Sequence, residues 1–214
     1  MKRRVVSAAL ALCMMLTLLS GTALAAGQHP FIDVPQSHWA NEAVGYVYEN
    51  DLMNGVSATM FQPGGSLTRA MFVTILGRMA GAEEESGESG FADVPAGRWY
   101  SAYVAWAAGE GIVDGTGNGC FSPNSPVTRE QMATMLYRYA QHKGYDVSIG
   151  ENTNLLSYTD FADLGEYAIS AMQWACGAGI INGTSDRTLT PLGSATRAQV
   201  AVMLMRFCTE YVSW

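Results

Sequence analysis

The sequence predicts an all-α fold in which three helix-loop-helix repeats share a helical core around a pseudo-three-fold axis. The first observation is a Thr-Arg pair that recurs at Thr68-Arg69, Thr128-Arg129 and Thr196-Arg197. Each pair begins a stretch with apolar residues at i, i+3, i+4 and i+7, the spacing of one buried helix face. Each stretch follows another helical stretch that ends at a glycine turn. Three such units without a polar capping repeat favour a closed ring over an open stack.

The N-terminal residues have the composition of a secretory signal peptide. Met1-Lys2-Arg3-Arg4 is basic, residues 5–19 are apolar, and small residues around Ala25 provide a cleavage site. An uncleaved membrane anchor is the alternative, but the apolar run is shorter than the ~20 residues that span a bilayer. We therefore expect residues 1–25 to be a signal peptide that is cleaved after Ala25 or one residue later. The remaining chain is then secreted and does not associate with the membrane.

The charge of the remaining chain excludes two classes of partner. All 19 acidic residues follow the predicted signal peptide, but only nine of the 12 basic residues do, so the formal charge becomes −10. Bulk electrostatics of this sign do not favour nucleic acid or anionic lipid. An anionic ligand would have to be recognised by local arginines.

Each repeat is expected to open with an aromatic residue followed two positions later by aspartate. The pairs are Phe31 and Asp33, Phe91 and Asp93, and Phe161 and Asp163. Trp39, Trp99 and Tyr167 follow these openings. Because aromatic residues near helical stretches usually pack inside, we expect four tryptophans to belong to the core: Trp39, Trp99, Trp106 and Trp174.

A first helix follows each opening and ends at a turn glycine. The apolar positions of these helices are Val44, Val47 and Tyr48, then Val104, Ala107 and Ala108, then Met172, Ala175 and Cys176. The turn glycines are Gly55, Gly115 and Gly183, each after Asn or Asp. Such dipeptides supply the positive φ angle of a helix stop. Each glycine lies 13 residues before the next Thr-Arg threonine.

The second helix of each repeat begins at the Thr-Arg pair. Threonine fits the N-cap, and Gln131 and Gln199 complete capping boxes in the second and third repeats. The predicted core positions are Phe72, Ile75, Leu76 and Met79, then Met132, Met135, Leu136 and Tyr139, then Val200, Met203, Leu204 and Phe207. An arginine in the first turn opposes the helix dipole, so three such arginines indicate a role other than helix stability.

The cysteines do not form a disulfide framework. Cys13 lies in the predicted signal peptide, which leaves the odd set Cys120, Cys176 and Cys208. Free, buried thiols are expected, with a bridge between Cys176 and Cys208 as the alternative. Repeat boundaries fall at residues 29–81, 89–142 and 159–210, and the first linker, from Gly81 to Gly90, is acidic and solvated by composition.

These residues resemble the surface layer homology (SLH) family. The pattern of Phe-x-Asp, helix, glycine turn, Phe-x-Pro and Thr-Arg-Ala covers Phe31 to about Glu210 in three copies, with Leu189 in place of the second phenylalanine in the third. The usual Thr-Arg-Ala-Glu motif ends here in Met71, Gln131 and Gln199, and its alanine is Glu130 in the second repeat. The resemblance implies a pseudo-trimer that anchors a protein at the bacterial cell surface. The implied ligand is cell-wall polysaccharide, often carrying ketal-linked pyruvate, bound in grooves between repeats.

The resemblance also implies a set of ligand-binding residues. They are Arg69, Arg129, Arg197, Asp33, Asp93, Asp163, Gly55, Gly115 and Gly183. The chemistry of these types agrees with it, since guanidinium groups match carboxylates and the free amides of a helix N-terminus add donors. Stacking on a sugar face is the alternative to a core position for Trp39 and Trp99. The alternative for each arginine is a structural ion pair with the repeat-opening aspartate, and both roles can hold.

Other classes of site have little support. The three histidines show no zinc spacing, no catalytic residue set or metal site stands out, and no cofactor is expected. Residues 114–119 faintly resemble a calcium loop but lack the closing glutamate, so an ordinary glycine-rich turn is expected. The alternative function is a surface-layer or protein-assembly scaffold with a surface protein as partner. An enzyme acting on wall glycans has no residue pair that selects it.

Overall fold

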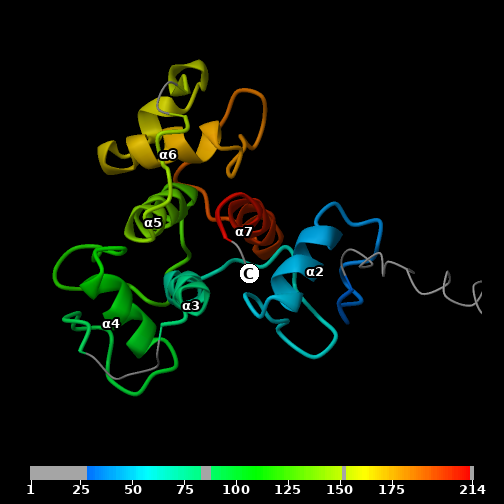
Figure 1. Ribbon diagram of the computed structural model, residues 1–214, viewed down its shortest axis with the longest axis horizontal. Helices are drawn as coiled ribbons and strands as arrows, with labels where there is room; N and C mark the ends of the chain where they lie inside the picture. The colour runs from blue at the N-terminus through cyan, green and yellow to red at the C-terminus, as the bar shows by residue number, and fades with distance from the viewer. Residues whose placement is uncertain (1–27, 83–87, 151–152, 213–214) are drawn as a thin grey trace, which may run out of the picture.

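The computed structural model describes residues 28–82, 88–150 and 153–212. The predicted signal peptide, residues 1–25, lies outside this part. The described residues form six α-helices and three short 3-10 helices, without β-strands (Figure 1). The α-helices are α2 (Asn41–Glu49), α3 (Arg69–Ala80), α4 (Ser101–Gly109), α5 (Arg129–His142), α6 (Ile169–Gly177) and α7 (Arg197–Tyr211). The 3-10 helices are η1 (Leu155–Ser157), η2 (Phe161–Asp163) and η3 (Glu166–Ala168).

The predicted pseudo-three-fold arrangement is confirmed. The three Thr-Arg helices α3, α5 and α7 surround the centre, and α2, α4 and α6 lie outside them (Figure 1). The segments just before the central helices are joined by isolated β-bridges. These bridges pair Ser66 with Thr196, Thr68 with Pro126, and Thr128 with Ser194. The bridges link every repeat to both others at the centre.

The outer helices pack across repeat boundaries. Helix α4 packs against α3, α6 against α5, and α2 against α7. Each packed pair therefore combines the second helix of one repeat with the first helix of the next, and the pairing of α7 with α2 closes the ring. Each repeat has two helices with one apolar face each. Because these faces pack against helices of the neighbouring repeats, the three repeats share one core.

The predicted helix starts are confirmed in detail. Thr68, Thr128 and Thr196 are the N-caps, and each hydroxyl accepts from the backbone amide three residues later at 3.3 Å. Capping boxes with Gln131 and Gln199 are present in α5 and α7. Such caps stabilise a helix by about 1 kcal/mol.

The predicted core is largely confirmed. All twelve positions predicted on the second helices are buried, from Phe72 to Phe207. In each first helix two of the three predicted positions are buried, and the third packs at the edge of the core. Trp174 is buried, and Trp106 packs partly buried against the core. Trp39 and Trp99 are the exceptions, with 65% and 58% of their surface exposed.

The three described cysteines are free. Cys208 is buried, whereas Cys120 and Cys176 are partly exposed. Burial raises the pKa of the Cys176 thiol to about 11 and that of Cys208 to about 12, so both remain protonated at neutral pH.

Candidate binding grooves between the repeats

The arginine of each Thr-Arg pair connects its own repeat to the next one. Arg69 donates from Nε to the carbonyl of Phe121 at 2.8 Å and from Nη2 to that of Asp114 at 3.0 Å. Arg129 makes the same two bonds to Leu189 and Asn182, at 2.7 and 2.6 Å. The contacts recur a third time between Arg197 and the first repeat.

This third set closes the ring. Arg197 donates to the carbonyls of Phe61 and Asn54, at 2.7 and 2.5 Å. All three arginine side chains are buried, and burial lowers their pKa from the usual arginine value. None lies within ion-pair distance of a carboxylate in the described part of the chain. The three buried cations contact backbone carbonyls, and Arg69 and Arg197 also lie over the rings of Phe121 and Phe61, but none has an ion-pair partner there.

The first-turn amides are not free, which corrects one expectation. Arg197 and Ala198 donate their backbone N–H groups to the carbonyls of Gly65 and Pro63. The corresponding amides of α3 and α5 donate to the loops of the second and third repeats in the same way. Since the next amide donates to the threonine cap, the helix N-terminus offers no anion site of the usual kind.

The repeat-opening aspartates do not pair with the arginines. The Asp33 carboxylate accepts from the amides of Phe61 and Gln62, at 2.9 and 2.7 Å. Asp93 accepts from Phe121 and Ser122 in the same way. The predicted ion pairs are therefore wrong, because the carboxylates are already used to hold a loop. Partial burial alone would raise the pKa of the Asp33 carboxyl, but these amide bonds keep it below its usual value.

Aspartate and arginine nevertheless act on the same loop residue. Asp33 holds the amide of Phe61, while Arg197 of the third repeat holds its carbonyl. The next residue, Gln62, has a φ angle of 61°, a conformation that costs energy for a residue with a side chain. The aspartate thus fixes a strained loop whose carbonyl receives the arginine.

The third repeat opens three residues earlier than the sequence suggested. Asp160, not Asp163, accepts from the amides of Leu189 and Thr190. Asp163 lies exposed in η2. The aromatic residue that fills the place of Phe31 is Tyr158, whose ring lies next to the Cβ position of Gly183. The triplet Phe161-Ala162-Asp163 has the same sequence as Phe91-Ala92-Asp93 in the second repeat, but its aspartate does not hold the loop.

The turn glycines are required by packing and not by backbone angle. Positive φ angles occur four residues earlier, at Asp51, Gly111 and Gly179. A Cβ atom on Gly55 would lie 2.4 Å from the Phe31 ring and 2.5 Å from the Ser57 carbonyl. The expected positive φ at these glycines is therefore wrong. Their absent side chain lets the opening aromatic pack against the turn.

Three grooves lie where the repeats meet, and we name each by its buried arginine. The Arg69 groove, with a cavity volume of about 350 Å³, is lined by Arg69, Asp114, Gly115, Gln131, Arg138 and Tyr167. The Arg129 groove, of about 240 Å³, is lined by Arg129, Asn182, Gly183, Gln199, Arg206 and Trp39. The Arg197 groove, of about 180 Å³, is lined by Arg197, Asn54, Met71, Arg78 and Trp99.

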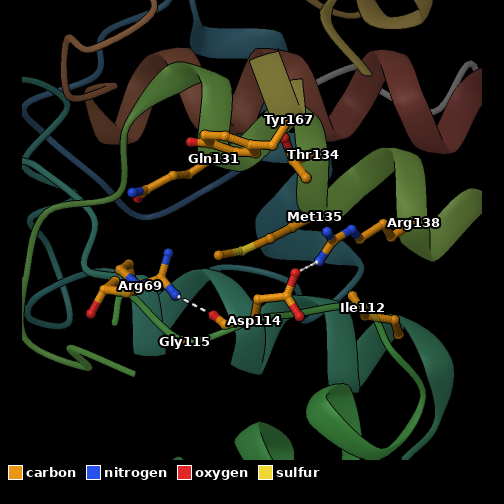
Figure 2. Close-up of a pocket in the computed structure, with 10 residues that line it drawn as sticks. Arg69, Ile112, Asp114, Gly115, Gln131, Thr134, Met135, Arg138 and Tyr167 are labelled. Atoms are coloured by element: carbon orange, nitrogen blue, oxygen red, sulfur yellow. Dashed lines mark hydrogen bonds and ion pairs between the residues drawn. The ribbon is translucent and has the colours of Figure 1, made fainter. Parts of the chain in front are cut away.

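Every groove takes residues from all three repeats. In the Arg69 groove the first repeat supplies Arg69, the second supplies Asp114 and Arg138, and the third supplies Tyr167 (Figure 2). Tyr167 lies across the groove from Arg69 and Asp114. Of the predicted site residues, the arginines and two of the glycines line these grooves. Asp33 and Asp93 hold the adjoining loops instead, and Asp163 does neither.

Two kinds of groove residue escaped the sequence analysis. The rim aromatics Trp39 and Trp99 were expected in the core. The second arginines, Arg78, Arg138 and Arg206, each lie nine residues after a buried arginine. That constant spacing was a signal that could have identified them.

The profile of the S-layer homology domain matches residues 30–71, 90–133 and 157–201. These matches span most of the chain and coincide with the three structural repeats. The chain belongs to the S-layer homology domain family. The third match begins one residue before Tyr158, as the first begins one residue before Phe31, in agreement with the corrected start of the third repeat.

Similar S-layer homology segments occur in much longer proteins. Identity is 34% over 175 residues with an endoglucanase of Bacillus sp. (strain KSM-635), covering 82% of this chain and 18% of the endoglucanase. It is 35% over 114 residues with the S-layer protein sap of Bacillus anthracis, covering 53% and 14% of the two chains. A cellulosome-anchoring protein of Acetivibrio thermocellus is 25% identical over 184 residues, 84% of this chain and 39% of the relative.

The chain therefore spans a small part of the relatives it matches. Among the residues that the structure describes, every helix is too short or too polar to cross a lipid bilayer.

Proposed function

We propose that this chain is a non-covalent anchor at the bacterial cell surface, and that its grooves bind acidic sugars of cell-wall polysaccharide. The family supports attachment to the wall, as do relatives named for S-layers and for anchoring. The observation that carries the ligand class is a buried guanidinium in each groove, without an ion-pair partner among the described residues, below an aromatic and arginine rim.

The buried arginine keeps donors for a ligand. A guanidinium has five N–H groups, and the two carbonyl contacts use Nε and Nη2. The remaining N–H groups of Arg129 and the whole guanidinium of Arg206 border the same groove. A carboxylate placed between them, such as that of a pyruvate ketal, supplies the missing negative charge and accepts from both.

The rim and walls suit a sugar ring. Trp39 exposes its indole in the Arg129 groove, and an apolar sugar face packs well against such a ring. Thr74, which lines the Arg197 groove, has 4% of its surface exposed. Its hydroxyl has no hydrogen-bond partner among the described residues. A buried hydroxyl of this kind costs stability unless a ligand or water satisfies it.

Sedimentation with purified walls tests the proposal. The chain should sediment with intact walls and remain in solution when the secondary polysaccharide has been extracted. Trp39→Ala and Arg206→Ala should weaken sedimentation, since each removes an exposed groove contact. Arg187→Ala is the matched control because Arg187 is exposed and lies outside the grooves.

Equal sedimentation with both wall preparations contradicts the proposal. Concentration-dependent oligomers in light scattering, together with no wall binding, would support the scaffold alternative.

A further inference from the structure

The three grooves differ at two positions that carry charge. Asp114 in the Arg69 groove corresponds to Asn182 and Asn54 in the other two. Glu130, behind the same groove, corresponds to Ala198 and Ala70. Both carboxylates thus belong to a single groove, and both replace uncharged residues.

Asp114 compensates the rim arginine of its groove. Its carboxylate forms an ion pair with Arg138 at 2.5 Å (Figure 2). Arg206 and Arg78, the corresponding rim arginines, have no carboxylate within ion-pair distance in the described ranges. In those two grooves the rim guanidinium is available to a ligand carboxylate. In the Arg69 groove the corresponding guanidinium, that of Arg138, already pairs with Asp114.

Glu130 holds the rim aromatic of the same groove. Its side chain is buried, and its two oxygens accept from the Tyr167 hydroxyl at 2.6 Å and the Gly165 amide at 2.9 Å. Burial and this bond raise the pKa of Tyr167, which stays protonated and donates. The corresponding indoles, Trp39 and Trp99, make no side-chain hydrogen bond within the described residues and contact neighbouring rings instead.

The formal charges of the grooves differ as a result. Two arginines and one lining carboxylate give the Arg69 groove a formal charge of +1, with the buried carboxylate of Glu130 directly behind its rim tyrosine. The Arg129 and Arg197 grooves each contain two arginines and no lining carboxylate, which gives +2. A ligand carboxylate entering the Arg69 groove would meet Asp114 and would have to displace it from Arg138.

We infer that the Arg69 groove binds an uncharged, hydroxyl-rich sugar, while the Arg129 and Arg197 grooves bind acidic ones. This inference rests on the proposed function. Asp114, Arg138 and Tyr167 offer hydrogen-bond donors and acceptors to hydroxyl groups, and the positive charge of the rim arginine is already paired. One chain would then select a polysaccharide in which acidic and neutral sugars occur together.

Two small probes test it by titration of the full chain. The acid probe is a methyl hexoside that carries a pyruvate ketal with a free carboxylate. The neutral probe is the same glycoside as its methyl ester. The NMR signals of Trp39, Trp99 and Tyr167 report on the Arg129, Arg197 and Arg69 grooves respectively.

In the Arg129 and Arg197 grooves, the acid probe should bind at least about tenfold more tightly than the ester, because unpaired arginines favour a carboxylate. Tyr167 should respond to the ester at least as strongly as to the acid. Asp114→Asn, which recreates the asparagine of the other grooves, should raise acid affinity at Tyr167 about tenfold. Asn182→Asp should lower the affinity for the acid probe, read from the Trp39 signal, by a similar factor. Asp186→Asn is the matched control, since Asp186 is exposed outside the grooves.

Equal affinity of the acid probe for all three grooves, or an unchanged Tyr167 response in Asp114→Asn, overturns the inference and leaves the proposed function standing. If neither probe shifts any signal while the chain still sediments with walls, the charge assignment fails in every groove. Loss of wall sedimentation as well would refute the proposed function itself.

Discussion

The inner and outer arginines of a groove are the same residue type in two different roles. Arg129 is buried and donates to two carbonyls of the next repeat. Arg206, across the same groove, is only partly buried and has no carboxylate partner among the described residues. The inner arginine holds two repeats together, whereas the outer arginine makes no ion pair among the described residues. A structural contact between repeats and a rim position thus occur in the same groove.

The sharpest test of this separation compares Arg197→Ala with Arg206→Ala. Removing Arg197 leaves the buried Phe61 carbonyl and the partly buried Asn54 carbonyl without donors and removes a cation–π contact on Phe61, a loss of about 3–5 kcal/mol of stability. Arg206→Ala should stay within about 0.5 kcal/mol of the parent. Urea unfolding followed by circular dichroism measures both. Similar losses for the two variants would show that the roles are not separate.

The corrected opening of the third repeat gives the next largest effect. Asp160→Ala removes the acceptor of the Leu189 and Thr190 amides, and we expect a loss of about 1–3 kcal/mol. Asp163→Ala is the matched control, because that side chain is exposed, and should change stability by less than about 0.5 kcal/mol. Equal stability of the two variants would contradict the corrected start of the repeat.

Glu130→Ala tests whether a rim aromatic needs its buried partner. The change removes two hydrogen bonds, to Tyr167 and Gly165, with a cost of about 1–2 kcal/mol. Thermal unfolding measures the loss, and an unchanged melting temperature would show that Glu130 does not hold Tyr167.

A small pH effect should come from the loop-holding aspartates. The pKa values of Asp33 and Asp160 are lowered in the folded chain, against partial burial, by amide hydrogen bonds. Their contribution to stability is therefore complete above the ordinary aspartate pKa of about 3.9 and is lost as the pH falls through the lowered folded values. Urea midpoints between pH 5 and about 3 should fall less steeply in Asp160→Asn. Parallel curves for parent and variant would exclude this linkage.

Local signals in the sequence were sufficient for the helices and most of the core. The threonine caps, both capping boxes and the twelve apolar positions depend on residues within one or two turns of each other. Helix periodicity and capping chemistry act at that range. The family resemblance supplied the three-fold arrangement of repeats and is confirmed by the profile match.

Partner choice over long distances could not be read from the sequence. Nothing local shows that Asp33 accepts from loop amides 28 and 29 residues away, or that α2 packs against α7. Trp39 was misplaced because an aromatic beside a helix fits a core and a groove rim equally well. The third repeat was misaligned because Tyr-Thr-Asp and Phe-Ala-Asp follow one another directly. Only tertiary contacts distinguish them, namely that of Tyr158 with Gly183 and those of Asp160 with the loop amides.

The pairing of α2 with α7 has a consequence for the order of folding. The first described helix, α2, packs against the last one, α7, so a contact between helices more than 140 residues apart completes the ring. Folding of this chain should therefore be slow for a helical protein of its size, since rates fall as contacting residues become more distant in sequence. A permuted chain that starts at α3 and joins α2 directly after α7 should reach the same structure faster.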